Sequence, residues 1–229
     1  MLSIIKSMAL HGLDGYLVDV EVDVSAGLPS WEVVGLPDTS VKEAKERVKT
    51  AIKNSNIDFQ SKRIIVNLAP ADTKKEGSSF DLPIAIGILV ATENIQNFNM
   101  NKIAFIGELS LDGRINKVNG VLPMCIEASR LGIKEIVVPR ENATEAAIVR
   151  NLKIIPAENL GEVIDYLNKI RQIEPIIIDT EKFFKHNSDY IFDFSEVKGQ
   201  ENIKRALEVS AAGGHNCLLI RKSRISVKR

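Results

Sequence analysis

The segment that most restricts the fold is an apolar stretch preceded by helix-start signals. Residues 80–95 read FDLPIAIGILVATENI, and Asp81 and Pro83 stand where the first turn of a helix favours them. The run 82–91 is apolar nearly all round, and its ten residues fall well short of the roughly 20 that a bilayer-spanning helix needs. Because a helix that is apolar on every side must be covered on every side, the sequence predicts a buried central helix.

Strand patterns surround this helix. Residues 17–24, LVDVEVDV, alternate apolar and acidic side chains with the period of a half-buried strand. Further strands are predicted at 31–36, 62–70, 134–139 and 153–155, with a hairpin over 102–118 that turns at Asp112 and Gly113. The mixture of hairpins and helices predicts an α/β fold with a mixed (α+β) sheet and not a regular βαβ array.

Helices with one apolar face are predicted between these strands. The first begins at a capping box formed by Ser40 and Glu43 and runs to Lys53. Others are predicted at 122–131, after Asn142 and Glu145, at 160–171 and at 200–212, where the last is followed by the start of a strand, CLLI.

Composition and charge exclude several classes of protein. With 45% hydrophobic and 26% charged residues, the chain is neither disordered nor, with two cysteines, a disulfide scaffold. We expect a cytoplasmic protein with no membrane contact. Thirty basic and thirty acidic residues give a net charge of zero, which argues against a dedicated nucleic-acid-binding protein, although residues 217–229 hold five basic side chains and no acid.

Three long stretches carry a family resemblance. Residues 27–52 (GLPSWEVVGLPDTSVKEAKERVKTAI), 62–89 (KRIIVNLAPADTKKEGSSFDLPIAIGIL) and 107–123 (GELSLDGRINKVNGVLP) closely resemble the N-terminal domain of the magnesium-chelatase-like AAA+ ATPases, the YifB/ComM competence-protein family. Residues 197–216, VKGQENIKRALEVSAAGGHN, resemble the opening of that family's ATPase module. The resemblance implies a Lon-protease-like fold, related to domain 2 of ribosomal protein S5. It also implies a hexameric motor on DNA that uses ATP and Mg²⁺ and acts as a helicase for branch migration during natural transformation.

The resemblance also divides the chain. It implies a Lon-protease-like domain at 1–171, a linker at 172–196, a truncated start of the AAA+ module at 197–220 and a basic tail outside the family pattern at 221–229. In the family, the strand that starts at CLLI runs into a P-loop, whose glycines let backbone N–H groups hold phosphates.

In this chain the strand runs into RKSRISVKR, with no glycine after Gly214, and Lys222 and Ser223 imitate only the final pair of a P-loop. We therefore expect that the end of the chain is truncated or out of frame and that its nucleotide site is incomplete. We also expect that the chain is not an ATPase and needs no cofactor. The residues that match the segment flanking adenine in the family are Val197, Gly199 and Gln200.

The resemblance to Lon raises the question of peptidase chemistry. A Lon-type peptidase activates a serine nucleophile with a lysine base. By alignment, Ser79 takes the nucleophile position and Leu122 the base position, and no lysine lies between Lys117 and Lys134. The sequence therefore predicts no catalytic residues, and it predicts that Ser79 and Asp81 cap the helix that follows.

Other candidate sites are weaker. The sequence predicts no metal site, because the histidines and cysteines lack ligand spacing. Asp19, Glu21 and Asp23 share one strand face and are expected to be solvated and not to bind a cation. Trp31 is expected in the core and not as a platform for base stacking. Two basic pairs are candidates for contact with a DNA backbone: Lys62 with Arg63, and Lys74 with Lys75.

The sequence thus favours an accessory and assembly domain of what, in the intact family, is an ATP-dependent DNA motor. The expected partners are DNA and further copies of the chain. Two alternatives stay open, a degenerate Lon-like serine peptidase domain and a stand-alone nucleic-acid-binding domain on the S5-like fold.

Overall fold

A computed structural model describes residues 1–55, 57, 62–96, 100–178 and 193–220. The chain divides into two compact units, Met1–Asp179 and Thr180–Arg229, which are described separately below. Residues 179–192 of the expected linker and the expected tail 221–229, with Lys222 and Ser223, lie outside the described residues.

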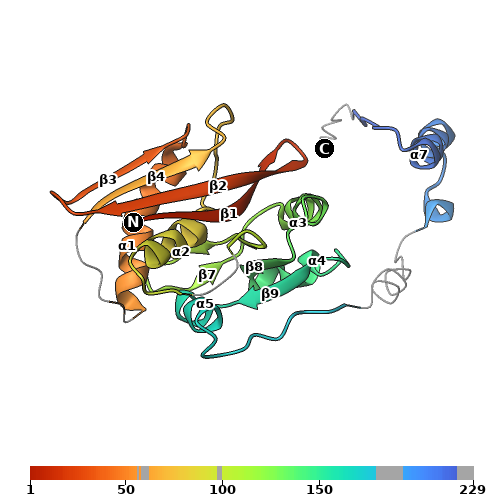
Figure 1. The fold of residues 1–229 in the computed structure, drawn as a ribbon. Coiled ribbons are helices and arrows are strands. Elements are labelled where there is room, and N and C mark those ends of the chain that lie inside the picture. Colours follow the sequence, from red (N-terminus) through yellow and green to blue (C-terminus); the bar gives the residue numbers. More distant parts are fainter. Residues whose placement is uncertain (56, 58–61, 97–99, 179–192, 221–229) are drawn as a thin grey trace, which may run out of the picture. The chain divides into compact units, whose positions relative to one another are not determined.

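The described residues of the first unit form a seven-stranded mixed sheet in the order β3-β4-β2-β1-β5-β8-β9 (Figure 1). Strands β1 and β2, and β2 and β4, pair antiparallel, and the other neighbours pair parallel. The mixed sheet confirms the fold class expected from the sequence. The strands are β1 (Leu2–His11), β2 (Asp14–Ser25), β3 (Ser30–Val34), β4 (Arg63–Ala69), β5 (Ile103–Phe105), β8 (Glu135–Pro139) and β9 (Lys153–Ala157).

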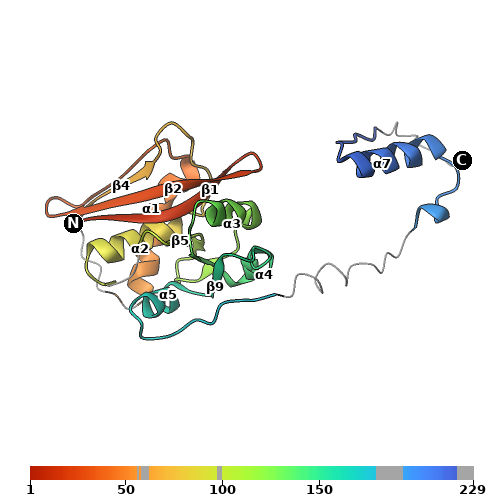
Figure 2. The ribbon, with the colours of Figure 1, turned by 45° about the vertical axis from the view of Figure 1, so that its right-hand side comes forward.

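One face of the sheet packs against α1 (Thr39–Asn54), α2 (Asp81–Ala91) and α5 (Leu160–Leu167). Every residue of α2 is buried, which confirms the central helix predicted from its apolar sequence. The alternation in β2 is also confirmed, since Val18, Val20, Val22 and Val24 are buried on this face. Figure 2 shows α2 lying under the long strands β1 and β2.

The other face carries a second core beneath α3 (Val121–Arg130) and α4 (Ala143–Ala146). Strands β5, β8 and β9 are buried on both faces: Phe105 belongs to the first core, and Ala104 beside it belongs to the second. Such two-sided burial explains why these three short strands read as continuous apolar runs.

Local details differ from the sequence predictions. The capping box at Ser40 and Glu43 is wrong, because α1 is capped by Asp38, which accepts a hydrogen bond from the Val41 N–H at 2.8 Å. The helix predicted after Asn142 does form, with Asn142 at its N-cap position, but the Asn142 side chain does not cap it because it binds both backbone groups of Val118. Helix α5 ends at Leu167, four residues before the expected end at 171.

The hairpin predicted over 102–118 is smaller in the structure. Its first residues form β5 inside the main sheet, and only β6 (Glu108–Leu109) and β7 (Ile115–Asn116) pair as a hairpin. The turn does contain Asp112 and Gly113, and Gly113 has a φ of +87°. The sequence alone predicts β5 as part of the hairpin, because its neighbours in the sheet, β1 and β8, are distant in sequence.

The first unit extends beyond the boundary expected at 171. Ile173 is buried, and the N–H of Ile176 donates to the carbonyl of Ile154 at 3.1 Å. Residues 172–178 therefore belong to the first unit. Within the described parts of the chain, no helix is long and apolar enough to cross a membrane.

The second unit contains a short 3₁₀ turn, η2 (Phe194–Glu196), and the helix α7 (Glu201–Gly213). No residue of α7 is buried. The strand predicted at CLLI does not form in the described residues, and Leu218, Leu219 and Ile220 are more than half exposed. A strand needs a neighbour for its backbone hydrogen bonds, and the described residues of this unit hold none.

Candidate functional site

The loop 74–80, which precedes α2, is the segment that the sequence predicts to match the Lon nucleophile loop. Backbone hydrogen bonds join it to the connection between β3 and α1: the Lys75 N–H donates to Leu36 and the Asp38 N–H donates to Lys75, at 3.1 and 2.9 Å. The second carboxylate oxygen of Asp38 accepts from the Gly77 N–H at 3.1 Å. Asp38 therefore fixes both the start of α1 and the loop.

Ser79 is 8% exposed, and its backbone carbonyl accepts from the Gly107 N–H at 3.0 Å. No hydrogen bond joins its hydroxyl to any described residue, and the start of α2 has no side-chain cap. The predicted capping role of Ser79 and Asp81 is therefore wrong. Leu122 lies in the first turn of α3 and is partly buried, so a leucine occupies the aligned base position.

Asp81 does not cap the helix because it forms a buried ion pair with Arg47 of α1. The two carboxylate oxygens accept from Arg47 Nε and Nη2 at 2.6 and 3.0 Å, and one of them also accepts from the Leu109 N–H at 3.2 Å. The Asp81 side chain is 1% exposed. Burial raises its pKa, and the hydrogen bonds and charge of Arg47 oppose that rise.

Ser78, beside the aligned nucleophile position, does have an acidic partner. Its hydroxyl donates to Glu108, whose other oxygen accepts from the Asn116 side chain at 3.1 Å. The hydrogen bond from Ser78 lowers the pKa of Glu108. A carboxylate with a lowered pKa is a weak base, so this pair is suited to holding the loop and not to activating a hydroxyl.

The prediction that Lys75 could contact DNA is wrong, because Lys75 is fully buried. Its ammonium group donates to the carbonyls of Pro70 and Thr73, the latter at 2.7 Å, and burial lowers its pKa. The adjacent Lys74 is exposed and pairs with Glu76 at 2.7 Å. One lysine of this sequence pair is thus structural, and the other lies at the surface.

The acidic face of β2 is paired with neighbouring side chains. Asp19 accepts from Lys6 at 2.7 Å and Glu21 from Asn67 at 2.9 Å, while Asp23 lies 3.8 Å from the N-terminal amine. Within the described residues, no group of three or more His, Cys, Asp or Glu side chains could hold a metal ion.

Two cavities in the first unit are lined by basic side chains. The larger, about 830 Å³, lies at the starts of β5, β8 and β9 and includes Lys102, Lys134 and Lys169, with Glu135 and Glu174 among its lining residues. The smaller, about 180 Å³, brings Lys62 together with Lys45 and Lys49 of α1 around Trp31. Of these three lysines, the sequence analysis predicted only Lys62 as a DNA contact. The four-residue spacing of Lys45 and Lys49, which places both on one face of a helix, could have indicated the other two.

The expected nucleotide-flanking residues lie just before α7 in the second unit. Val197 is 39% exposed, and Gly199 and Gln200 have φ values of +70° and +60°. They form the turn that begins α7.

Comparison with known families assigns both units. The model for subunit ChlI of Mg-chelatase matches residues 20–142, and a model described as magnesium chelatase, subunit ChlI, matches residues 193–223. The first match covers most of the sheet, α1, α2, α3 and the loop 74–80, and the second contains α7.

Similar proteins support the same assignment. The chain is 38% identical over 221 residues to the competence protein ComM of Haemophilus influenzae and 40% identical over 221 residues to YifB of Escherichia coli, with 96% of the chain aligned in each case. It spans 43% and 42% of those two proteins. The Lon protease of Brucella suis is 27% identical over 185 residues, which cover 76% of the chain and 22% of that protease. The chain therefore belongs to the magnesium-chelatase-like protein family that includes ComM and YifB.

Proposed function

We propose that the first unit is a Lon-like domain without peptidase activity, which serves as an accessory and assembly module for an ATP-dependent motor on DNA. The observation that supports this proposal is that one alignment runs through both units, from the Lon-like sheet into α7. The family's association with competence, given by the name of the Haemophilus relative, supports DNA as the substrate.

Nucleotide chemistry belongs, in this proposal, to the ATPase module of longer family members. Within the 229 residues, the segment that follows α7 has no glycine after Gly214, so it lacks the glycine-rich backbone that a P-loop uses to hold phosphates. We therefore propose that these 229 residues do not hydrolyse ATP, and that ATP and Mg²⁺ act in the longer proteins.

A domain exchange tests the accessory role. Residues 1–178 replace the aligned segment of the Haemophilus competence protein, and this chimera is compared with the parent and with a version that lacks the segment. We expect the chimera to assemble into the parent's oligomer and to retain DNA-stimulated ATP hydrolysis, and the deletion to lose assembly. The proposal fails if the deletion assembles and hydrolyses ATP like the parent, or if the chimera folds but does neither.

We expect the chain to show no serine peptidase activity, because Ser79 has no base at Leu122 and no hydroxyl hydrogen bond among the described residues. Incubation with unfolded casein should give no cleavage, and a fluorophosphonate probe should not label Ser79 in mass spectrometry. Ser79→Ala serves as the matched control. Labelling that disappears in Ser79→Ala would favour the degenerate-peptidase alternative instead.

A further inference from the structure

The small cavity at Trp31 is distinct from the Lon-like loop. Its cationic lining comes from two places in the sequence, Lys45 and Lys49 on α1 and Lys62 just before β4. Pro29, Ser30 and Ile64 complete the lining, which contains no acidic side chain. The charge of the cavity is therefore positive, and the ligands it favours are anions.

These lysines are largely free of competing ion pairs. Lys45 lies 3.9 Å from Glu46, a long contact between two exposed side chains, and Lys49 and Lys62 form no ion pair with any described residue. An exposed pair of this kind contributes little energy and is readily exchanged for a phosphate. All three ammonium groups can therefore serve an anionic ligand.

Trp31 gives the cavity an aromatic wall. The side chain packs against the first core, as expected from the sequence, but it is only partly buried. Its indole N–H is enclosed and has no acceptor among the described residues. Buried donors without acceptors are rare, and no hydrogen bond to a described residue fixes the indole of Trp31.

The basic surface continues along α1 beyond the cavity. Lys42, Lys45, Lys49 and Lys53 follow one another at intervals of three or four residues and therefore share one helix face. Lys42 and Lys53 are exposed at either end of this row. The row is an extended track of positive charge that suits a linear polyanion better than a single small ion.

We propose that the Trp31 cavity and the lysine row of α1 form a contact site for single-stranded nucleic acid. Lys45, Lys49 and Lys62 bind backbone phosphates, and Trp31 packs against a base. Aromatic side chains beside a basic track are the usual means of binding single strands without sequence preference. The inference takes the choice of polyanion from the proposed role at DNA, but its test needs neither an ATPase module nor an oligomer.

Trp31 is the single tryptophan of the chain, so its fluorescence reports directly on this site. We expect a short oligothymidylate to quench it saturably at low salt. Three phosphate contacts predict a slope of about −2 in a plot of log affinity against log salt. A duplex oligonucleotide should bind more weakly, because its bases are not free to stack on Trp31.

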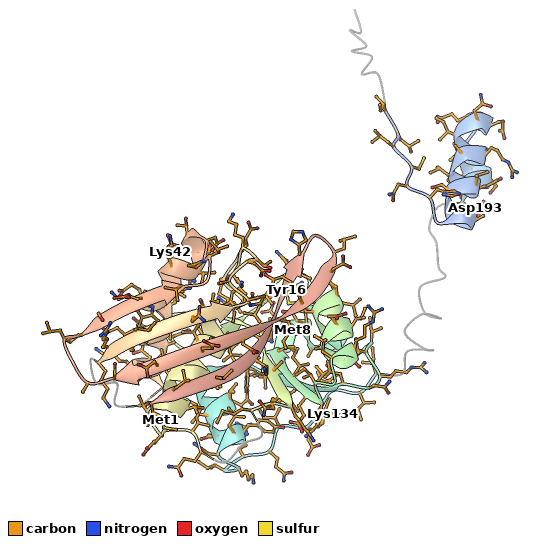
Figure 3. The ribbon with its side chains drawn as sticks, turned by 45° about the horizontal axis from the view of Figure 1, so that its top comes forward. Met1, Met8, Tyr16, Lys42, Lys134 and Asp193 are labelled. Carbon is orange, nitrogen blue, oxygen red and sulfur yellow. The ribbon has the colours of Figure 1, made fainter. Side chains whose placement is uncertain are left out.

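The triple variant Lys45→Gln/Lys49→Gln/Lys62→Gln should lose at least about tenfold in affinity and most of the salt dependence. The matched control, Lys102→Gln/Lys134→Gln/Lys169→Gln, removes the same charge from the larger cavity and should bind like the unaltered chain. Lys42 of the row and Lys134 of the larger cavity are widely separated in Figure 3. Circular dichroism checks that both variants fold, and the single variant Lys49→Gln provides a milder test.

A second pair of variants separates the aromatic contact from charge. In fluorescence anisotropy with a labelled oligonucleotide, Trp31→Phe should bind within a few-fold of the unaltered chain, and Trp31→Ala about tenfold more weakly. Equal losses of affinity in the two triple lysine variants would overturn the proposed site, since binding would then follow net charge alone. Inorganic pyrophosphate or a phosphopeptide that binds as tightly as the oligonucleotide would overturn the choice of nucleic acid. Either outcome leaves the domain-exchange test of the proposed function unaffected.

Discussion

Replacing Arg47 by methionine should destabilise the first unit by about 3 kcal/mol, because it leaves the Asp81 carboxylate buried without its charge partner. Arg47 joins α1 to the start of α2 through two hydrogen bonds to that carboxylate, and a third bond reaches its own helix at the Ser40 carbonyl. The Arg47 side chain is 24% exposed, so the loss should lie at the lower end of the range for buried pairs. Urea unfolding followed by circular dichroism measures it.

Two further variants identify the cause. Arg47→Met/Asp81→Asn should recover more than half of the lost stability, because the amide is neutral and still accepts from the Leu109 N–H. Lys74→Met, which breaks the exposed pair with Glu76, should have no measurable effect. If Arg47→Met were as stable as Lys74→Met, the buried pair would not hold the two helices together.

The pH dependence of Arg47→Met follows from the raised pKa of Asp81. Burial already raises this pKa in the folded chain, and loss of Arg47 removes the interactions that lower it. The folded variant then binds a proton more tightly than its unfolded chain does, so protonation favours folding. The stability deficit of Arg47→Met should therefore shrink as the pH falls from neutral through the folded pKa, and persist at higher pH.

The sequence predicted those elements whose signal is local. The alternation of β2 and the all-round apolar sequence of α2 each report burial directly, because side-chain periodicity follows the geometry of a single element. Strand β5 has only three residues, and its partners β1 and β8 come from distant parts of the chain. A pattern read along the sequence could not place it in the sheet.

Residue type alone could not assign the polar side chains around the loop 74–80. Asp38 and Ser40 are both good caps, and the structure favours Asp38 because its second oxygen also binds Gly77. Lys74 and Lys75 have the same side chain. Lys75 is the buried one, and the carbonyls of Pro70 and Thr73 accept hydrogen bonds from its ammonium group. In each case the deciding partner is a backbone group that the folded chain brings into reach.

The sequence predicted only some residues of the candidate site, because the others are brought together by the fold. The assignment of Ser79 and Leu122 to the Lon nucleophile and base positions rests on continuous sequence motifs and stays a prediction. The grouping of Lys62 with Lys45 and Lys49 depends on the pairing of β3 with β4 and on the packing of α1, and no sequence motif records it.

Gly35→Ala should be among the most damaging single changes in the first unit, because Gly35 has both a restricted backbone angle and no space for a side chain. Its φ is +94°, and an added Cβ would lie 2.3 Å from the carbonyl oxygen of Leu68 in β4. The neighbouring atoms are backbone atoms of β4, which pairs with a strand on each side, so they cannot rotate away. Overpacking and strain together predict a loss of about 3 kcal/mol or more.

Gly12→Ala separates these two causes. Gly12 also has a positive φ, +64°, but an added Cβ there would meet nothing within 4 Å, so this variant should lose only about 1 kcal/mol. Urea midpoints for both variants measure the difference, which reports the collision with Leu68. Because residues 36–38 carry the hydrogen bonds to Lys75, displacement of Gly35 should also speed amide hydrogen exchange at Lys75 and Asp38. Equal stability of the two variants would mean that β4 yields to the added methyl group, and the close approach at Gly35 would then not hold the loop in place.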